Sequence, residues 1–286
     1  MADDIAARVD DALARFLDAS AERVGTMDPA SSVMVDEVRR LLAAGGKRIR
    51  PAFCYWGFRA AGGADEGASG DAIVRAAAAL ELLHTMAIVH DDLIDGAKER
   101  RGIPTTEVWF AEHAVELEAP GDPAELGRSM AILVGDLCAV WADELLDGSG
   151  FEVSAVARAR VRYDEMRVRM AVGQVLDVGG AAGDLEVARR AAALKGGSYT
   201  VEGPLLIGAA LGDAATGVEM SLAAFARPLG EAFQLRDDLD DGDAPAGVTR
   251  ETVASLVEEA TSALDPSVLN PEAIEALAWL ADRIAR

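Results

Sequence analysis

Two acidic clusters constrain this chain more than any other feature. The stretches DDLID at 91–95 and DDLDD at 237–241 each contain the spacing D-D-x-x-D inside an otherwise apolar, helix-like segment. Residues four apart share one face of an α-helix, so Asp91 lies above Asp95, and the second cluster repeats this arrangement. Stacked carboxylates repel one another and destabilise a helix, so we expect a cation beside them. We call these clusters the first and second aspartate motifs.

Hard oxygen ligands favour Mg²⁺, which typically binds one or two carboxylates, substrate phosphates and retained water. The first interpretation is therefore two facing helices that bind a diphosphate group through magnesium. Each motif supplies three candidate metal ligands: Asp91, Asp92 and Asp95, with Asp237, Asp238 and Asp241.

Composition favours an all-α fold. Hydrophobic residues make up 51% of the 286 residues and aromatic residues only 5%, and alanine runs such as 76–79 are common. Such a sequence suits closely packed helices better than a β-sandwich, which needs more β-branched and aromatic residues. No low-complexity tract, tandem repeat or dividing linker is evident, so we expect a single helical domain over residues 1–286.

The net charge limits the possible partners. A formal charge of −22 argues against nucleic acid, whose phosphate backbone needs a basic protein surface, and against docking on anionic lipid. An anionic substrate would be repelled by the protein as a whole, so local cations and metal would have to attract it. For most acidic residues, the simpler interpretation is a surface that keeps the protein soluble.

Cysteine usage and the N-terminus predict a cytoplasmic protein. Cys54 and Cys138 have no C-x-x-C spacing, which is typical of buried, reduced thiols. The N-terminus is acidic and lacks the apolar segment of a signal peptide. No uncharged run is long enough to span a bilayer, so we expect no stable membrane insertion.

Hydrophobic periodicity and Gly/Pro punctuation predict a succession of helices separated by short loops. Loops are expected at 61–70, 98–106 and 119–123. The expected helices cover about 3–27, 33–44, a segment from about 50, 71–95, 129–146, 155–178, 185–198, 204–211, 220–241, 249–264 and 271–284. Asn270 as N-cap and Pro271 in the first turn mark the last helix.

Basic residues near the first motif are candidates for binding an anion. In GGKRIRP at 45–51, Lys47 supplies a point charge and Arg50 a planar fork on a glycine turn. A basic turn is more often simply solvated, but in so acidic a chain the anion-binding interpretation gains weight. Arg100 and Arg101, just after the first motif, could neutralise its aspartates or complete a phosphate site.

Polar residues inside apolar helical stretches are further candidates. His84 lies about two turns before Asp91 and near the same helix face, whereas His90 points elsewhere. His113 has no evident partner, and we assign it no role. The stretch GQVLD at 173–177 places Gln174 one turn from Asp177, and Lys195 opens a polar gap at 195–200. A core histidine, a helix kink or an interhelical hydrogen bond would explain these residues without a function.

Taken in order, these motifs resemble the trans-polyprenyl diphosphate synthases, the prenyltransferases that make geranyl, farnesyl or geranylgeranyl diphosphate. The resemblance covers about residues 30–242 and rests on G-K-x-x-R-P, H before D-D-x-x-D, R-R, G-Q-x-x-D, a helical lysine and F-Q-x-x-D-D-x-x-D. It implies an all-α bundle around a deep central cavity, and a homodimer.

The resemblance also implies roles for the candidate residues. The six aspartates would hold Mg²⁺ on an allylic diphosphate, which Arg100 would also bind. Gln174 and Lys195 would line the cavity and steady the reacting allyl group, and Gln234 lies in the second motif. The site for isopentenyl diphosphate would be formed by Lys47, Arg50, His84 and Arg101.

The chemistry implied is a head-to-tail condensation. Metal and cationic side chains stabilise the departing diphosphate, the double bond of isopentenyl diphosphate attacks the allylic cation, and released diphosphate takes a proton. Met86 and Ala87, one turn before Asp91, are not aromatic, so the cavity floor should stay open. We therefore expect a product of farnesyl length or longer, with geranylgeranyl diphosphate as the leading hypothesis.

The chain departs from the family pattern at three places. Gly196 follows the lysine where a serine or threonine is usual, and Glu107 stands where a histidine is common. After Asp241 the usual glycine-lysine loop is missing, so the domain is expected to be shortened beyond residue 242. A non-catalytic partner of an active synthase is therefore a serious alternative. A class I terpene cyclase is disfavoured because it needs no site such as Lys47 and Arg50 provide.

Overall fold

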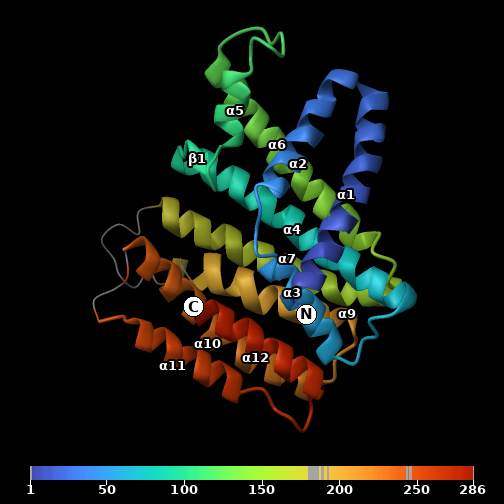
Figure 1. The fold of residues 1–286 in the computed structure, drawn as a ribbon, viewed down its shortest axis with the longest axis vertical. Helices are drawn as coiled ribbons and strands as arrows, with labels where there is room; N and C mark the ends of the chain where they lie inside the picture. Colours follow the sequence, from blue (N-terminus) through green and yellow to red (C-terminus); the bar gives the residue numbers. More distant parts are fainter. Residues whose placement is uncertain are drawn as a thin grey trace. The chain divides into compact units, whose positions relative to one another are not determined.

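The structure, a computed structural model, describes residues 2–179, 187, 190–191, 193–242, 244 and 247–285. Helices form nearly all of its regular secondary structure, and the two strands that it contains in these residues have two residues each. The prediction of an all-α fold is confirmed (Figure 1). Cys54 and Cys138 are both buried and free, as predicted, and burial raises the pKa of the Cys54 thiol to about 12.

The chain forms two compact units, and each contains one aspartate motif. The first-motif unit comprises residues 6–48 and 74–148, and the second-motif unit comprises residues 1–5, 49–73 and 149–286. The two are described separately below, and the prediction of one domain over the whole chain stays a prediction.

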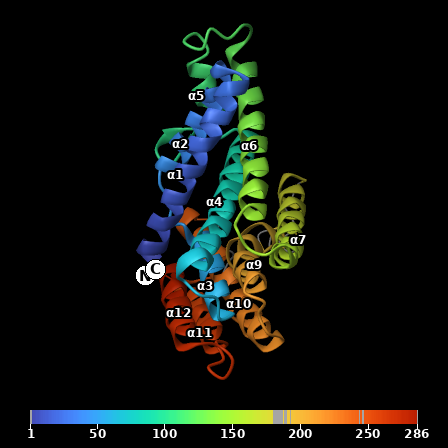
Figure 2. The same cartoon turned by 90° about the vertical axis from the view of Figure 1, so that its right-hand side faces the viewer.

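The first-motif unit is a bundle of long helices, whose packing can be followed in Figure 2. Phe16 of α1 meets Trp141 of α6 edge to face with ring centroids 6.0 Å apart, and α2 and α5 also pack on α6. Its elements are α1 (Ala2–Met27), η1 (Pro29–Ser32), α2 (Val33–Ala43), α4 (Gly67–Asp95), β1 (Glu99–Arg100), β2 (Ile103–Pro104), α5 (Thr106–Glu112) and α6 (Pro123–Asp147).

The second-motif unit packs its helices through small residues. A Cβ on Gly208 of α9 would lie 1.8 Å from the carbonyl oxygen of Cys54, so α3 and α9 approach closely only because glycine is there. In Figure 1, α10, α11 and α12 lie side by side, and contacts join all three. The elements are α3 (Ile49–Ala60), α7 (Val153–Val178), η2 (Ala193–Glu202), α9 (Gly203–Leu211), α10 (Thr216–Asp241), α11 (Arg250–Ser262) and α12 (Pro271–Ala285).

Local sequence signals explain the ends of several helices. The backbone N–H of Ala273 donates to Asn270 Oδ1 at 2.8 Å, which confirms the predicted cap of α12. Gly242 ends α10 with a left-handed φ of 83° that a side chain would strain. The second motif thus occupies the last turn of α10.

Several segments differ from the prediction, and residues 67–70 of the loop predicted at 61–70 already belong to α4. The stretch 98–106, predicted as a loop, contains the β1–β2 hairpin, and α5 follows it directly. The polar stretch 195–200 lies inside the π-helix η2, so the helix predicted to end at 198 continues to Glu202. Much of the helix predicted over 185–198 falls outside the described residues.

Helix α4 is long and apolar enough to cross a membrane by length and composition, and no other described helix is. However, 72% of its apolar window is buried inside the protein, as in the core helix of a soluble bundle. The expectation of no membrane insertion stays a prediction.

Candidate active site

The first aspartate motif occupies the last turn of α4, and one arginine contacts two of its carboxylates. Arg100 Nε donates to Asp92 Oδ1 at 2.6 Å, and Arg100 Nη2 lies 3.8 Å from Asp91 Oδ2. The Asp92 side chain is only 6% exposed, whereas Asp91 is partly open and Asp95 is exposed. Burial raises the pKa of Asp92, although Arg100 acts in the opposite direction.

The hairpin that carries Arg100 also brings Arg101 to the basic turn. Strands β1 and β2 pair at Arg100 and Ile103, so Arg101 and Gly102 form the tight turn, with φ of 54° and 76°. The guanidinium of Arg101 donates to the carbonyl oxygen of Gly45. Burial lowers the pKa of Arg101, and the neighbouring Arg48 and Arg100 act in the same direction. Arg101, predicted to share a binding site with Lys47, therefore contacts the glycine turn that carries Lys47, and its role in binding stays a prediction.

Arg48, one of the three cations of the glycine turn that were predicted to form an anion site, instead points inward and holds the turn in place. It is buried, and its φ of 48° is unusual for a residue other than glycine. Its guanidinium donates to Glu81 and Asp10, both at 2.7 Å, and to the carbonyl oxygen of Leu42 at 3.0 Å. A glutamate inside the apolar stretch of α4 was the one sequence signal that could have indicated a buried cation.

Gly46 allows the two arginines to pack together. A Cβ at this position would lie 2.8 Å from Arg48 Nη1 and 3.3 Å from Arg101 Nη1. Next to it, Lys47 is exposed. A cavity of about 20 Å³, with room for roughly one water molecule, lies between the glycine turn, α4 and the hairpin, and polar side chains border it. They are Arg48, Glu81, Thr85, Asp92, Arg100 and Arg101.

The second aspartate motif is held by neighbours on its own helix. Arg236 donates to the carboxylate of Asp237 and lies 3.7 Å from Asp240. Gln234 Nε2 donates to Asp238 Oδ1 at 2.7 Å, one turn along α10. The side chain of Asp241, the last predicted ligand, lies outside what the structure describes.

Two contacts involve the other predicted residues of the second-motif unit, one made by Lys195 and one by Arg50. Lys195 of η2 donates to Asp177 Oδ2 of α7 at 2.8 Å, and Gln174 is half-buried one turn before Asp177. Arg50 donates to Thr200 Oγ1 at 2.8 Å, and its guanidinium lies 4.6 Å from the centre of the Tyr199 ring. Helix η2 therefore contacts the helix that carries Gln174, and it also contacts Arg50, one of the four residues predicted to bind the second substrate.

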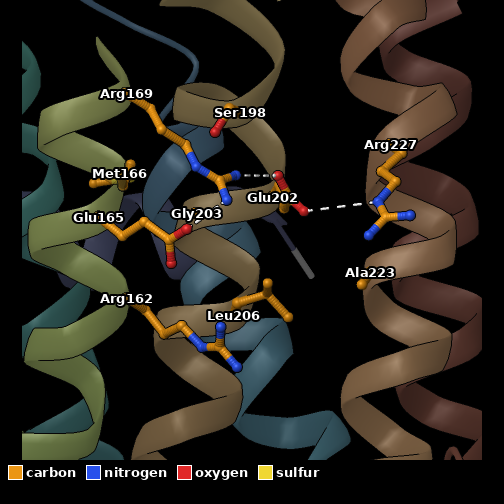
Figure 3. A pocket seen from close by; sticks show the side chains of 10 residues that line it. All are labelled: Arg162, Glu165, Met166, Arg169, Ser198, Glu202, Gly203, Leu206, Ala223 and Arg227. Carbon is orange, nitrogen blue, oxygen red and sulfur yellow. Dashed lines mark hydrogen bonds and ion pairs between the residues drawn. The ribbon is translucent and has the colours of Figure 1, made fainter. Parts of the chain in front are cut away.

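An ion-pair network ties η2 to the helices on either side (Figure 3). Arg169 of α7 donates to Glu202 at 3.1 Å and to Glu165 at 2.5 Å, and Arg227 of α10 lies 4.0 Å from Glu202. Together with Arg162 and Ser198, these side chains border a cavity of about 210 Å³ whose other walls are apolar. Since Glu202 already lies between two arginines, this network holds η2 in place between α7 and α10.

The three histidines of the first-motif unit have different surroundings. His84 is half-buried on α4, whereas His90 packs against Gly135 of α6, 3.3 Å from the carbonyl oxygen of Ile132. The prediction that His90 points away from the motif is confirmed. The expectation that His113 has no partner is wrong, because its ring stacks on Trp109 with centroids 4.3 Å apart and its Nδ1 lies 2.7 Å from the carbonyl oxygen of that residue.

The chemistry of the donor set fits Mg²⁺. Within the described ranges, no three acidic, histidine or cysteine side chains are gathered closely enough to hold a metal by themselves. Magnesium does not need such a cluster, because one or two carboxylates with phosphate and water complete its coordination. Asp91 and Asp95 on α4, and Asp237 and Asp238 on α10, supply such partial sets. That the two motifs face each other stays a prediction.

The fold and these residues define a class of all-α proteins with two carboxylate motifs at helix ends and arginines beside them. The sequence model of the polyprenyl synthetase family matches residues 32–263, so this chain belongs to that family.

Individual relatives agree with this assignment. A geranylgeranyl diphosphate synthase of Cyanophora paradoxa is 32% identical, with 72% of this chain and 64% of the relative covered. A geranylfarnesyl diphosphate synthase of Aeropyrum pernix is 30% identical, with 70% of this chain and 58% of the relative covered. The chain thus spans less than two thirds of the length of either relative.

A solved structure extends the likeness over the whole chain. The geranylgeranyl pyrophosphate synthase of Corynebacterium glutamicum, in complex with isoprenyl diphosphate and magnesium, aligns with a TM-score of 0.90 at 27% identity. The alignment covers 100% of this chain and 99% of that protein.

Proposed function

We propose that this protein is a Mg²⁺-dependent prenyltransferase that condenses isopentenyl diphosphate head-to-tail with an allylic diphosphate. The observation that carries the proposal is the position of Arg100. This arginine contacts Asp91 and Asp92, and the next residue of the hairpin, Arg101, reaches the basic glycine turn. Carboxylates for a metal and guanidinium groups for phosphate therefore lie within one small cluster.

Each predicted residue has a task in this reaction. The aspartates of the two motifs would hold Mg²⁺, which would supply positive charge to the leaving diphosphate. Arg100 binds the same diphosphate, and the diphosphate of the second substrate is bound by Lys47, Arg50, His84 and Arg101. Gln174 and Lys195 steady the allylic cation, which the double bond of isopentenyl diphosphate attacks. Apolar helix faces keep water away from that cation, and released diphosphate accepts the final proton.

The proposed product is geranylgeranyl or farnesyl diphosphate. Met86 and Ala87 precede the first motif by one turn of α4, both are half-buried, and neither is aromatic. Substituting Met86→Phe should shorten the dominant product by one or more isoprene units if this face limits the chain. Chromatography of the dephosphorylated products measures this, with Val140→Phe on exposed α6 surface as control. An unchanged product distribution would show that Met86 does not form the floor of the cavity.

We further propose that the protein is a cytoplasmic homodimer. Helix α7 exposes valines at heptad spacing: Val161, Val168 and Val175 are 66%, 63% and 70% exposed. Exposed valines on one helix face favour a second helical surface as their partner, and a second copy supplies one by symmetry. Sedimentation of the wild type and of Val168→Asp would test this, since a monomeric wild type contradicts it.

The decisive experiment is elongation by the isolated protein. Dimethylallyl or geranyl diphosphate with labelled isopentenyl diphosphate should give longer prenyl diphosphates in Mg²⁺ and none in EDTA. Failure of every allylic primer would favour a non-catalytic partner of another synthase. Hydrocarbon released from farnesyl diphosphate, without any elongation, would favour a terpene cyclase.

A further inference from the structure

Gly196 and Gln234 occupy the same space between η2 and α10. A Cβ built on Gly196 would lie 2.1 Å from Gln234 Oε1, a distance that real atoms do not tolerate. The next nearest atoms, at 3.2 and 3.9 Å, are Cδ and Cβ of the same glutamine. The amide of Gln234 therefore lies where a side chain at position 196 would begin.

The other end of that amide contacts the second aspartate motif. Gln234 Nε2 donates to Asp238 Oδ1 at 2.7 Å. An ionised carboxylate can only accept hydrogen bonds, so the nitrogen must point to Asp238 and the oxygen to Gly196. The orientation of the amide is thus fixed by the acceptor on one side and by the space above Gly196 on the other.

Next to this pair, the backbones of η2 and α10 are in direct contact, so the helices cannot move closer together. A Cβ on Gly197 would lie 2.8 Å from the carbonyl carbon of Gly230, so η2 and α10 touch through two glycines. This crossing lies one helical turn before Gln234 on α10. With the backbones in contact, a side chain at position 196 can be accommodated only if Gln234 moves.

We propose that Gly196 is a positioning residue that acts through Gln234 on Asp238. The absence of a side chain at 196 admits the glutamine amide, and the amide orients the Asp238 carboxylate for the metal-bound diphosphate. The role of Asp238 rests on the proposed prenyltransferase function, whereas the contact among the three residues does not. The family pattern has serine or threonine at position 196. In this chain the glycine there leaves the space that the Gln234 side chain occupies.

A double-mutant cycle tests this proposal. The variants are Gly196→Ala, Gln234→Ala and the double substitution, with Gly25→Ala as control. A Cβ at Gly25, also in a helix, meets its nearest neighbour at an ordinary 3.5 Å. Two readouts are independent of catalysis: the thermal midpoint in EDTA, and the Mg²⁺ concentration that gives half of the thermal shift with inorganic diphosphate.

Gly196→Ala should lower the midpoint in EDTA by about 3 °C, because it displaces the half-buried amide of Gln234 and breaks its hydrogen bond to Asp238. It should also raise the Mg²⁺ requirement about tenfold, as the loss of a carboxylate's hydrogen-bond partner does elsewhere. In the double variant the methyl group fits, so its midpoint should equal or exceed that of Gln234→Ala. The Mg²⁺ requirement of the double variant should match that of Gln234→Ala.

Two results would overturn the proposal: a Gly196→Ala protein that matches the Gly25→Ala control in both readouts, or effects of the single substitutions that simply add in the double variant. If the wild type fails to elongate any primer, the proposed function is refuted. The cycle still decides whether the three residues are coupled.

Discussion

The two aspartate motifs have the same spacing but are held in different ways. In the first, Asp92 is buried and its cation comes from a separate hairpin, eight residues further along the chain. In the second, Asp237 and Asp238 are half-buried, and their partners Arg236 and Gln234 belong to the same helix. Identical sequence patterns therefore experience different electrostatic environments.

The first motif therefore depends on tertiary structure, and the second depends mainly on helix geometry. Arg100 reaches Asp92 only if the hairpin turn at Arg101 and Gly102 keeps its left-handed backbone. Arg236 and Gln234 keep their places as long as α10 is helical and η2 leaves room. Substitutions around the first motif should therefore couple to distant residues, and those around the second to α10 and η2.

The largest expected effect is loss of activity at a ligand of either motif. Asp91→Asn and Asp237→Asn should each lower kcat/KM about 10³-fold, because each removes a charged metal ligand needed as the leaving group departs. Steady-state elongation assays measure this, with the exposed Asp11→Asn as control. Equal activity of the Asp237→Asn and wild-type proteins would show that the second motif is not a metal site.

The next largest effect concerns stability in the first-motif unit. Arg48 and Glu81 form a pair with side chains only 6% and 5% exposed, so Glu81→Gln should lower the free energy of unfolding by about 3 kcal/mol. Removing both charges with Arg48→Met and Glu81→Leu should restore much of that loss. Urea unfolding measures it, with Glu144→Gln, from the exposed pair with Arg23, expected to cost less than about 1 kcal/mol. Equal losses in the two pairs would contradict a buried role for Arg48.

A smaller effect separates the two arginines. Arg100→Gln should raise the KM for the allylic diphosphate about tenfold, since one charge-assisted contact to phosphate and the neutralisation of Asp92 are lost together. Arg236→Gln should change that KM less than about threefold. Arg236 also donates to the carbonyl oxygen of Ile284 and contacts carboxylates of its own helix, so less of its charge is available to the substrate. The reverse ranking would show that the second motif binds the allylic diphosphate more directly than the first.

Much of the helix pattern could be predicted from the sequence, for reasons visible in single residues. The run from Met220 to the second motif is helical as expected, and Asn270 caps the last helix. The pairing of Arg48 with Glu81 could not be predicted, because it depends on a left-handed backbone and on a partner 33 positions away. Likewise, the sequence shows Gly196 only as a departure from the family pattern. Its contact with Gln234 depends on the π-helix η2, which the sequence did not predict.

Asp92 provides the smallest expected effect and the finest test of the comparison. Burial raises its pKa above the ordinary value of 3.8, so the folded protein holds this proton more tightly than the unfolded chain does. Keeping Asp92 ionised therefore costs stability at neutral pH, and the cost disappears as pH falls through the raised pKa towards the ordinary value.

Asp92→Asn should accordingly unfold at a higher urea concentration than the wild type at pH 7, by less than about 0.5 M, while activity falls. The difference should shrink as the pH approaches 4, and the surface variant Asp11→Asn should show no such trend. A variant less stable than the wild type at pH 7 would mean that the contact with Arg100 outweighs burial. The first motif would then be stabilised by its arginine, as the second is by Arg236, and the two would differ only in where that arginine lies in the chain.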